Sequence, residues 1–451
     1  MKHVIACHEC DALHYLQRLP EQAEAHCSCC DANLYRHVSS QAVSHSLALY
    51  LASLMLFIMA NSLPFMSLKL AGRVQEDMLL SGPMALFAMG MGDLGLLVLC
   101  TSIVFPLLTI LAALYLLIPA ALGYRVFAMA SVFRMMQRLM PWSLLGVFML
   151  AVLIAMVKLL DLAEIEVGLS LMAFAVLLPV SVLAQRSMDS SLFWPHQFHD
   201  DALEHVNNAP VNHIQPANHD VIVAQPLGRA LASGLLHCHT CAMSVQQPND
   251  DLADHTSLHC PRCDDHLHAR KANSIARTWA LLIAAVMLLF PANMLPIMTV
   301  IQFGQGDPST ILSGVLHLIH AGMWPLGLIV FFASIMVPVS KLVTLVFLLL
   351  SVHFKSTWNP RDRTRLYRLT ERIGSWSMVD IFIIGVLTSL VSLDALATIE
   401  PGIAASYFAV SVILTMFAAQ SFDARLIWDA SEKTRDDVAD EYTVKMEHIH
   451  G

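Results

Sequence analysis

Residues 51–64 read LASLMLFIMANSLP, and residues 283–296 read IAAVMLLFPANMLP. Both are apolar runs that close on Asn-x-Leu-Pro, and the second ends 232 residues after the first (64 to 296). Further residues return at an offset of 232, or of 234 beyond one basic loop: Leu80 as Leu312, Pro106 as Pro338, Trp142 as Trp376, Glu166 as Glu400, Asp189 as Asp423 and Trp194 as Trp428. The sequence therefore predicts two equivalent units.

The composition places both units in a membrane. Of the 451 residues, 56% are hydrophobic and only 14% are charged, whereas soluble domains carry about 25% charged residues. A helix needs about 20 apolar residues to cross a bilayer. Eight stretches meet this requirement: 46–66, 94–118, 142–161, 168–186, 279–300, 323–351, 377–394 and 403–420. The predicted fold class is an all-α polytopic membrane protein with four transmembrane helices in each unit.

The distribution of charge predicts the topology. Arg and Lys gather in two loops, after the second and the sixth span: Arg125, Arg134, Arg138, Lys355, Arg361, Arg363, Arg365, Arg368 and Arg372. These loops are expected in the cytoplasm, and an even number of spans then puts both termini there too. The first residues contain no apolar stretch, so we expect no cleavable signal peptide. Four spans per unit predict a parallel repeat about an axis along the membrane normal, and the net charge of -9 argues against nucleic-acid partners.

A cysteine-bearing head precedes the spans of each unit. In both heads two Cys-x-x-Cys pairs are separated by a short segment, of 16 residues in the first and 18 in the second. This spacing is typical of zinc ribbons, in which each pair supplies two thiolates to one tetrahedral ion. The predicted ligands are Cys7, Cys10, Cys27 and Cys30, then Cys238, Cys241, Cys260 and Cys263. Dithiol redox chemistry is the open alternative, and the surplus Cys29 is either a free thiol or an exchangeable ligand.

The resulting domain organisation alternates heads and membrane modules. The predicted boundaries are 1–37 for the first zinc ribbon, 46–186 for the first transmembrane module, 187–235 for a flexible linker, 236–270 for the second zinc ribbon, 279–420 for the second module and 421–451 for a cytoplasmic tail. The linker is assigned because it shows neither helical nor strand periodicity. Asn61 and Asn293 are expected to mark the end of the first helix of each module, and prolines such as Pro106 and Pro338 to kink the second.

Four charged residues lie inside predicted spans. Lys341 is deep in the sixth span, Asp380 is about one turn into the seventh, and Lys158 and Asp161 are near the far end of the third. Each such charge costs about 2.5–3.5 kcal/mol if it faces lipid at mid-membrane, so these side chains are expected to face protein, a cavity or water. In the other unit Lys341 aligns with Thr109, Asp380 with Gly146 and Lys158 with Ser392. The charges are therefore not required merely for folding.

Two interpretations of these charges stay open at this point. Lys158 can reach the interface and pair with Asp161, while Lys341 pairs with Asp380 as a buried ion pair. Our hypothesis is instead that the four residues line one polar path between the modules, to which the hydroxyls of Ser334 and Thr415 contribute. The hydroxyls have a simpler role as helix-packing groups.

Several longer motifs resemble a known family. They are the paired Asn-x-Leu-Pro, PSTILSGV from Pro308, ASIMVPVSK ending at Lys341, WSMVDIF from Trp376 and SFDAR from Ser421. Together with the two four-cysteine heads, they are similar to the PqiA/LetA (YebS) family. The segment VKLLD from Val157 looks more like the LetA branch. One departure is Ala424, where the family pattern has proline, which leaves the shape of that turn in doubt.

The resemblance implies a function and a partner. Members are Gram-negative inner-membrane proteins that work with a periplasm-spanning MCE-domain tunnel protein and move phospholipids between the two membranes. We therefore expect a phospholipid transport protein that supports outer-membrane integrity and is not an enzyme. Buried lysines suit a lipid phosphate, and the chain has no phosphate-binding Gly-Lys-Ser/Thr loop for an internal ATP motor. The alternatives are a thiol–disulfide or electron relay through the heads and a passive anchor for the tunnel protein.

Overall fold

The computed structural model describes residues 4–15, 24–36, 41–70, 73–124, 126–159, 164–194, 221–224, 228–246, 258–302, 305–320, 322–390 and 397–429. Within these residues eight helical segments are long and apolar enough to cross a membrane: Ala42–Ser62, Gly92–Ala121, Met129–Val157, Leu169–Ser187, Ser274–Met294, Trp324–His353, Pro360–Ser389 and Ile403–Ser421. The predicted fold class, with four such segments in each of two repeated units, is confirmed.

The two units repeat the same order of elements. The first contains α1 (Ala42–Ser62), β5 (Met66–Leu70), β6 (Arg73–Asp77), α2 (Ser81–Ala88), α3 (Gly92–Leu99), η1 (Cys100–Val104), α4 (Phe105–Ala121), α5 (Met129–Leu139), η2 (Met140–Trp142), α6 (Leu145–Leu159), β7 (Glu164–Val167) and α7 (Leu169–Ser187). The second contains α9 (Ser274–Met294), β11 (Met298–Gln302), β12 (Gln305–Ser309), α10 (Ile311–His320), α11 (Trp324–Phe331), η4 (Phe332–Met336), α12 (Val337–His353), α13 (Pro360–Ile373), η5 (Gly374–Met378), α14 (Val379–Leu390), β13 (Ala397–Pro401) and α15 (Ile403–Ser421).

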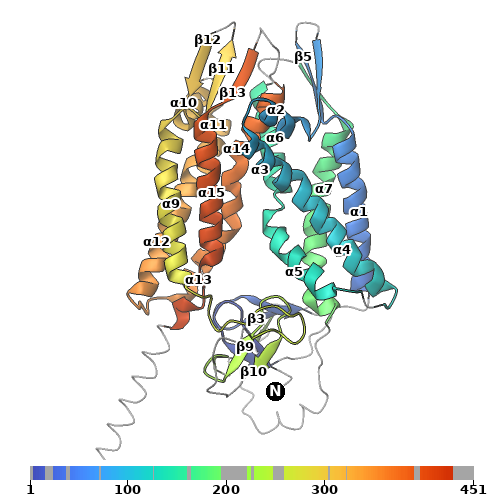
Figure 1. Ribbon diagram of the computed structural model, residues 1–451, viewed down its shortest axis with the longest axis vertical. Helices are drawn as coiled ribbons and strands as arrows, with labels where there is room; N and C mark the ends of the chain where they lie inside the picture. Colours follow the sequence, from blue (N-terminus) through green and yellow to red (C-terminus); the bar gives the residue numbers. More distant parts are fainter. Residues whose placement is uncertain are drawn as a thin grey trace, which may run out of the picture.

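The molecule has two distinct ends, which we call the sheet end and the head end. At the sheet end each unit forms a three-stranded antiparallel sheet, in the order β6-β5-β7 in the first and β12-β11-β13 in the second. At the opposite end lie the cysteine heads together with the basic helices α5 and α13 (Figure 1). The predicted placement of the heads and the basic loops on one side agrees with this arrangement.

The first helix of each unit ends at the Asn-x-Leu-Pro motif. Asn61 and Asn293 donate from Nδ2 to the carbonyl four residues earlier, and the chain is extended one or two residues later. Proline disfavours helical backbone at the preceding residue, which stops the helix. The predicted spans 46–66 and 279–300 therefore ran too far, because the apolar pattern continues into the first strand of each sheet.

Both long second spans contain one wide turn. The five-residue π-helices η1 and η4 interrupt them directly before Pro106 and Pro338, which occupy the second position of the helices that follow. Proline lacks the N–H that would otherwise bond one turn back, so a helix accommodates it by loosening the preceding turn. The kinks expected at these prolines thus take the form of π turns.

A glycine locks the last span of each unit against the first. Gly168 and Gly402 precede α7 and α15, and their N–H groups donate to the carbonyls of Phe65 and Ile297 at 3.0 and 2.8 Å. A Cβ at Gly402 would collide with the carbonyl oxygen of Pro296, and the first unit has the same contact. Only glycine lets the two backbones approach this closely. The pairs α1–α7 and α9–α15 pack side by side as a result.

Helix α14 joins the two units. It packs against α2 and α6 of the first unit. In the most apolar part of its span 82% of the residues are buried, whereas the other seven spans have 22–56% buried. Gly82 and Gly385 permit the close approach, because a Cβ on Gly82 would lie 3.1 Å from the carbonyl oxygen of Gly385. Phe382 adds an edge-on contact with Phe148 of α6, with ring centroids 5.4 Å apart.

The heads are small strand pairs. The first contains β1 (Val4–Ala6) with β2 (Leu13–Tyr15) and β3 (Glu24–Cys27) with β4 (Asn33–Arg36); the second contains β9 (Leu235–His237) with β10 (Ser244–Gln246). The stretch predicted as a linker also contains β8 (Val221–Ala224), which pairs in parallel with β3. The expectation that this stretch lacks strands is wrong at these four residues, because the pairing partner is distant in sequence.

Replacing Gly402 with alanine tests the lock between the first and last spans. We expect Gly402→Ala to destabilise the second unit by about 1–3 kcal/mol, the usual cost of overpacking, because the new Cβ displaces the Pro296 carbonyl. Thermal unfolding in detergent measures the effect. Gly314→Ala is the matched control, since a Cβ at that position would meet no atom within 4 Å; equal melting temperatures for both variants would contradict the lock.

Candidate functional site

Each head positions its cysteines with two identical tight turns. The residue after the second cysteine of every pair has a left-handed backbone: Asp11, Asp31, Ala242 and Asp264, with φ between 55 and 64°. Its N–H donates to the carbonyl of the first cysteine of the pair, at 2.8–3.0 Å. This backbone conformation is uncommon for residues other than glycine, although aspartate is enriched in it. The turn brings the two thiols of a pair to the same side.

The structure brings all eight predicted cysteine ligands into two buried clusters. Within each cluster the four Sγ atoms lie within 4.8 Å of one another. The closest contacts are Cys7–Cys30 and Cys10–Cys27 at 3.5 Å, Cys238–Cys263 at 3.4 Å and Cys241–Cys260 at 3.5 Å. A tetrahedral ion with metal–sulfur bonds of about 2.3 Å places its sulfurs about 3.8 Å apart. Both donor sets therefore fit one four-coordinate metal ion each.

Two further residues of the first head bear on its cluster. Cys29 lies outside the four-sulfur group and is partly exposed. His14, which the sequence analysis did not select, is fully buried with Nε2 3.2 Å from Cys27 Sγ. A ring nitrogen in this position can orient a metal ligand from outside the coordination sphere. The second head has Val245 at the same place in its strand pair, and only this difference between the heads could have revealed His14.

In the second unit, four elements that contact one another, α12, η4, η5 and α14, carry buried polar side chains. Lys341 is 3% exposed, Asp380 7%, and Ser334 and Ser377 1% each. Among the described residues, the hydroxyls of Ser334 and Ser377 have no hydrogen-bond partner. Lys341 Nζ lies against Gly374, so closely that a Cβ there would come within 2.8 Å of it. We call Lys341, Asp380, Ser334, Ser377 and the adjoining Gly374 the polar cluster.

The corresponding place in the first unit is neutral. A cavity there is lined by Thr109, Met140, Ser143 and Ser181, the counterparts of Lys341, Gly374, Ser377 and Thr415. Its free volume of about 10 Å³ suits at most a single water molecule. Between the units a larger side chain replaces a smaller one on one element, Lys341 for Thr109, and the reverse occurs on the other, Gly374 for Met140. The exchange introduces a charge.

The polar cluster does not include the other residues predicted to line the polar path. The Thr415 hydroxyl, 3% exposed, donates to the Val412 carbonyl of its own helix at 2.7 Å, as in ordinary helix packing. Lys158 lies in the last turn of α6, but its side chain and the whole of Asp161 fall outside the described residues. Glu371 of α13, whose charge acts on Lys341, was not selected. Comparison with Gln137, the neutral residue at the same position of the first unit, could have identified it.

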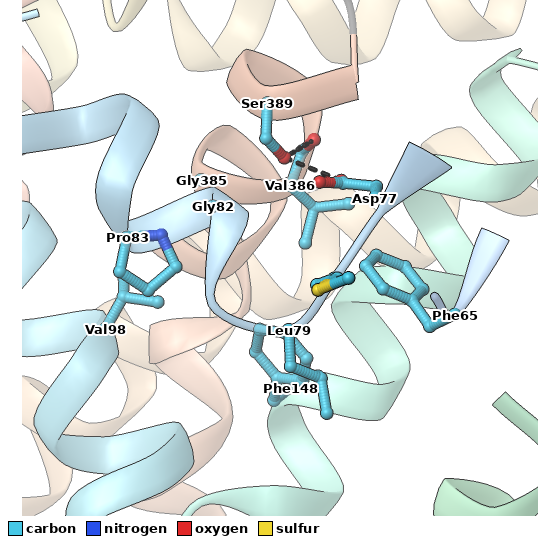
Figure 2. Close-up of a pocket in the computed structure, with 11 residues that line it drawn as sticks. Phe65, Asp77, Leu79, Gly82, Pro83, Val98, Phe148, Gly385, Val386 and Ser389 are labelled. Atoms are coloured by element: carbon cyan, nitrogen blue, oxygen red, sulfur yellow. Dashed lines mark hydrogen bonds between the residues drawn. The ribbon is translucent and has the colours of Figure 1, made fainter. Parts of the chain in front are cut away.

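A second buried acid lies between the units at the sheet end. Asp77 of β6 is 2% exposed and accepts a hydrogen bond from Ser389 of α14, at 2.7 Å. Figure 2 shows both side chains at the edge of a small apolar cavity, where Gly82 and Gly385 face each other. Burial raises the pKa of Asp77 to about 7. No other residue that lines this cavity is titratable, and the repeat places Ser309 at the position of Asp77, so the contact occurs once.

The fold and the cysteine clusters define a multi-pass α-helical membrane protein built from two repeated units, each with a four-cysteine head that can hold a metal ion. The chain belongs to the family described as paraquat-inducible protein A (PqiA), whose model matches residues 43–197 and 275–432. These two segments coincide with the two membrane units. The resemblance predicted from the sequence motifs is thus confirmed at the level of the family.

Curated relatives match almost the whole chain. It is 32% identical over 430 residues to the intermembrane transport protein PqiA of Escherichia coli (strain K12), covering 95% of this chain and 96% of that one. It is 30% identical over 427 residues to the lipophilic envelope-spanning tunnel protein A of the same organism, covering 94% and 91%. These identities do not separate the two branches, so membership of the LetA branch stays a prediction. No solved structure matches the chain.

Metal analysis tests the two cysteine clusters. We expect two metal ions per chain in the purified protein and one after Cys10→Ser or Cys241→Ser, because three thiolates and a hydroxyl hold such an ion far more weakly. Inductively coupled plasma mass spectrometry gives the metal content. Cys29→Ser is the matched control and keeps both ions; loss of an ion in that variant would place Cys29 among the ligands.

The buried Asp77 makes the joint between the units sensitive to pH. Since its pKa is about 7 when folded and about 3.9 when unfolded, the folded state favours the protonated acid. This contribution to stability is complete below pH 4 and is lost as the pH rises to 7, with a limit of about 4 kcal/mol. We expect Asp77→Asn to raise the melting temperature at pH 8 and not at pH 4. The exposed Asp93→Asn serves as control, and identical pH profiles for wild type and Asp77→Asn would refute the effect.

Proposed function

We propose that this protein is the inner-membrane component of an intermembrane phospholipid transport system. In this role it passes lipids between the bilayer and a periplasm-spanning MCE-domain tunnel protein, and so supports outer-membrane integrity. The names of its relatives, an intermembrane transport protein and a lipophilic envelope-spanning tunnel protein, support transport between membranes. The head end would face the cytoplasm, in accord with the basic helices α5 and α13, and the sheet end would face the tunnel protein.

The observation that carries the proposal is the polar cluster of the second unit. A buried lysine and two buried hydroxyls without partners among the described residues are costly unless something pairs with them. The first unit keeps both serines, as Ser102 and Ser143, but has Thr109 in place of the lysine. A unit of this fold therefore does not require the lysine. An ammonium group and hydroxyls are suitable donors for a lipid phosphate, and the surrounding apolar helix faces suit the acyl chains.

The proposed path continues from the polar cluster toward the sheet end. Lys158, in the last turn of α6, and Asp161, three residues farther along the chain, would be its outer members, with Asp380 and Lys341 closer to the head end. Helix α6 packs along α14, so a lipid head group moving along this joint would pass from one set of charges to the other. Thr415 would contribute only packing, because its hydroxyl is already bonded within its own helix.

The proposed metal in the heads is zinc, in a structural role. Four thiolates and no exposed coordination position are typical of structural zinc sites, which fold domains too small to hold a core. The relay alternative would need the thiols in separate reactive pairs. The convergence of four sulfurs in each head supports metal binding instead, and the expected activity is transport without catalysis.

Neutralising Lys341 tests the proposed lipid site. We expect Lys341→Met to weaken phospholipid binding by about 2 kcal/mol, roughly 30-fold, the value of a charge-assisted hydrogen bond. Native mass spectrometry of the purified protein measures the bound lipid, and complementation of a deletion strain measures barrier function. Thr109→Ala, at the matching position of the first unit, is the control. Equal lipid content and full complementation by Lys341→Met and by Asp380→Asn would rule out the polar path and favour a passive anchor.

A further inference from the structure

Each head binds the membrane module of the other unit. The first head, which leads into α1, lies on α13 of the second unit: Arg368 Nη2 donates to the Cys30 carbonyl at 2.9 Å, and its Nε is 3.3 Å from Glu9 Oε2. The second head, which leads into α9, lies on α5 of the first unit, where Arg134 Nη1 donates to the Cys263 carbonyl. In Figure 1 the heads accordingly lie together between the lower ends of α13 and α5.

The repeat relates these two contacts. Arg134 and Arg368 are 234 residues apart, and each donates to the carbonyl of the fourth cysteine in a head. That carbonyl directly precedes the left-handed residue of the last tight turn, outside the strands of the head. The same donor and acceptor are therefore present in both contacts between a head and the module of the other unit.

Two tryptophans follow the same crossed pattern. Trp428, after the last span of the second unit, packs against the buried cluster of the first head that contains its four cysteine ligands. Its counterpart Trp194, after the last span of the first unit, packs against the second head. Each also contacts the basic helix of its own module: Trp194 has an edge-on contact with Phe133 at 5.3 Å, and Trp428 Nε1 donates to Thr364 Oγ1 at 2.9 Å.

The two heads are also joined to each other. Asp11 of the first head accepts from Arg270 of the second, at 3.2 Å, and its backbone carbonyl accepts from the N–H of Ala230 at 2.9 Å. Arg270 in turn pairs with Asp429, beyond α15, at 2.7 Å. The Arg270 and Asp11 side chains are only 16% and 4% exposed, so this pair is shielded from solvent. The heads therefore act as one body.

We propose that the paired heads form a crossed clamp that fixes the separation of the two membrane modules at the head end, with Arg134 and Arg368 as its positioning residues. A head that is covalently attached to one module and bound to the other cannot follow either module alone. The modules can separate at this end only if both arginine contacts are released. This inference concerns the conformation of the protein and does not depend on the proposed transport.

A distance measurement in the full chain tests the clamp. Spin labels carried by unnatural amino acids replace the exposed Gln137 on α5 and Arg361 on α13, and pulsed electron paramagnetic resonance in lipid nanodiscs gives their separation. We expect a narrow distribution for the otherwise unchanged chain. The double variant Arg134→Gln/Arg368→Gln shifts it to longer distances and broadens it, and Arg134→Lys/Arg368→Lys, which keeps one donor at each site, recovers part of the original distribution.

The matched control removes two neighbouring arginines of the same helices. Arg138 and Arg365 form ion pairs with Asp265 and Asp31, but their side chains are 75% and 52% exposed, and such surface pairs contribute little. Arg138→Gln/Arg365→Gln should leave the distribution unchanged. An unchanged distribution in Arg134→Gln/Arg368→Gln, or an equal shift in both double variants, would overturn the clamp.

A second measurement does not depend on how well the variants fold. A benzophenone amino acid at position 138 of the otherwise unchanged chain, activated in membranes, should crosslink to residues 258–270 of the second head. The same group at position 365 should crosslink to residues 24–36 of the first head. Crosslinks from position 138 to residues 24–36 would mean that each head lies on its own module, and the proposal would then be wrong.

Discussion

The packing of α14 against the first unit is the contact on which the rest of the arrangement depends. Gly82 and Gly385 let α2 and α14 approach backbone to backbone, and Asp77 accepts from Ser389 just beyond them. Because α14 is surrounded by protein, its first turn can carry Asp380 without exposing it to lipid. The same joint brings η5 and α14 of the second unit against α6 of the first, so the helix that carries Asp380 lies at the boundary between the two.

Differences between residues at equivalent positions of the two units explain why the polar cluster carries a charge in the second unit only. The first unit fills the position with Thr109 and Met140, and the second with Lys341 and Gly374. The second unit thereby gains a positive charge that the same position of the first unit does not have. The cysteine heads show the opposite behaviour: both clusters keep four ligands, four tight turns recur, and the arginine that binds each head is repeated.

Local patterns in the sequence predicted the elements whose stability is local. Apolar runs of sufficient length predicted the spans, Asn-x-Leu-Pro predicted where the first helix of each unit ends, and the spacing of the cysteines predicted the two clusters. The strands of the sheet end were missed because hydropathy does not distinguish an apolar strand from the end of a span. His14, Asp77 and Glu371 were missed for another reason: their partners come from other elements, and Ser389 is 312 residues from Asp77. Comparison of the two units detects such residues better than inspection of either alone.

In the proposed transport, a phospholipid head group binds at the polar cluster of the second unit and not at its neutral counterpart in the first. Photocrosslinking in membranes with a phospholipid that carries the reactive group on its head tests this most directly, with the labelled peptides identified by mass spectrometry. We expect labelling of residues 332–341 and 374–390. Equal labelling of residues 100–109 and 140–156, or labelling of neither region, would contradict it.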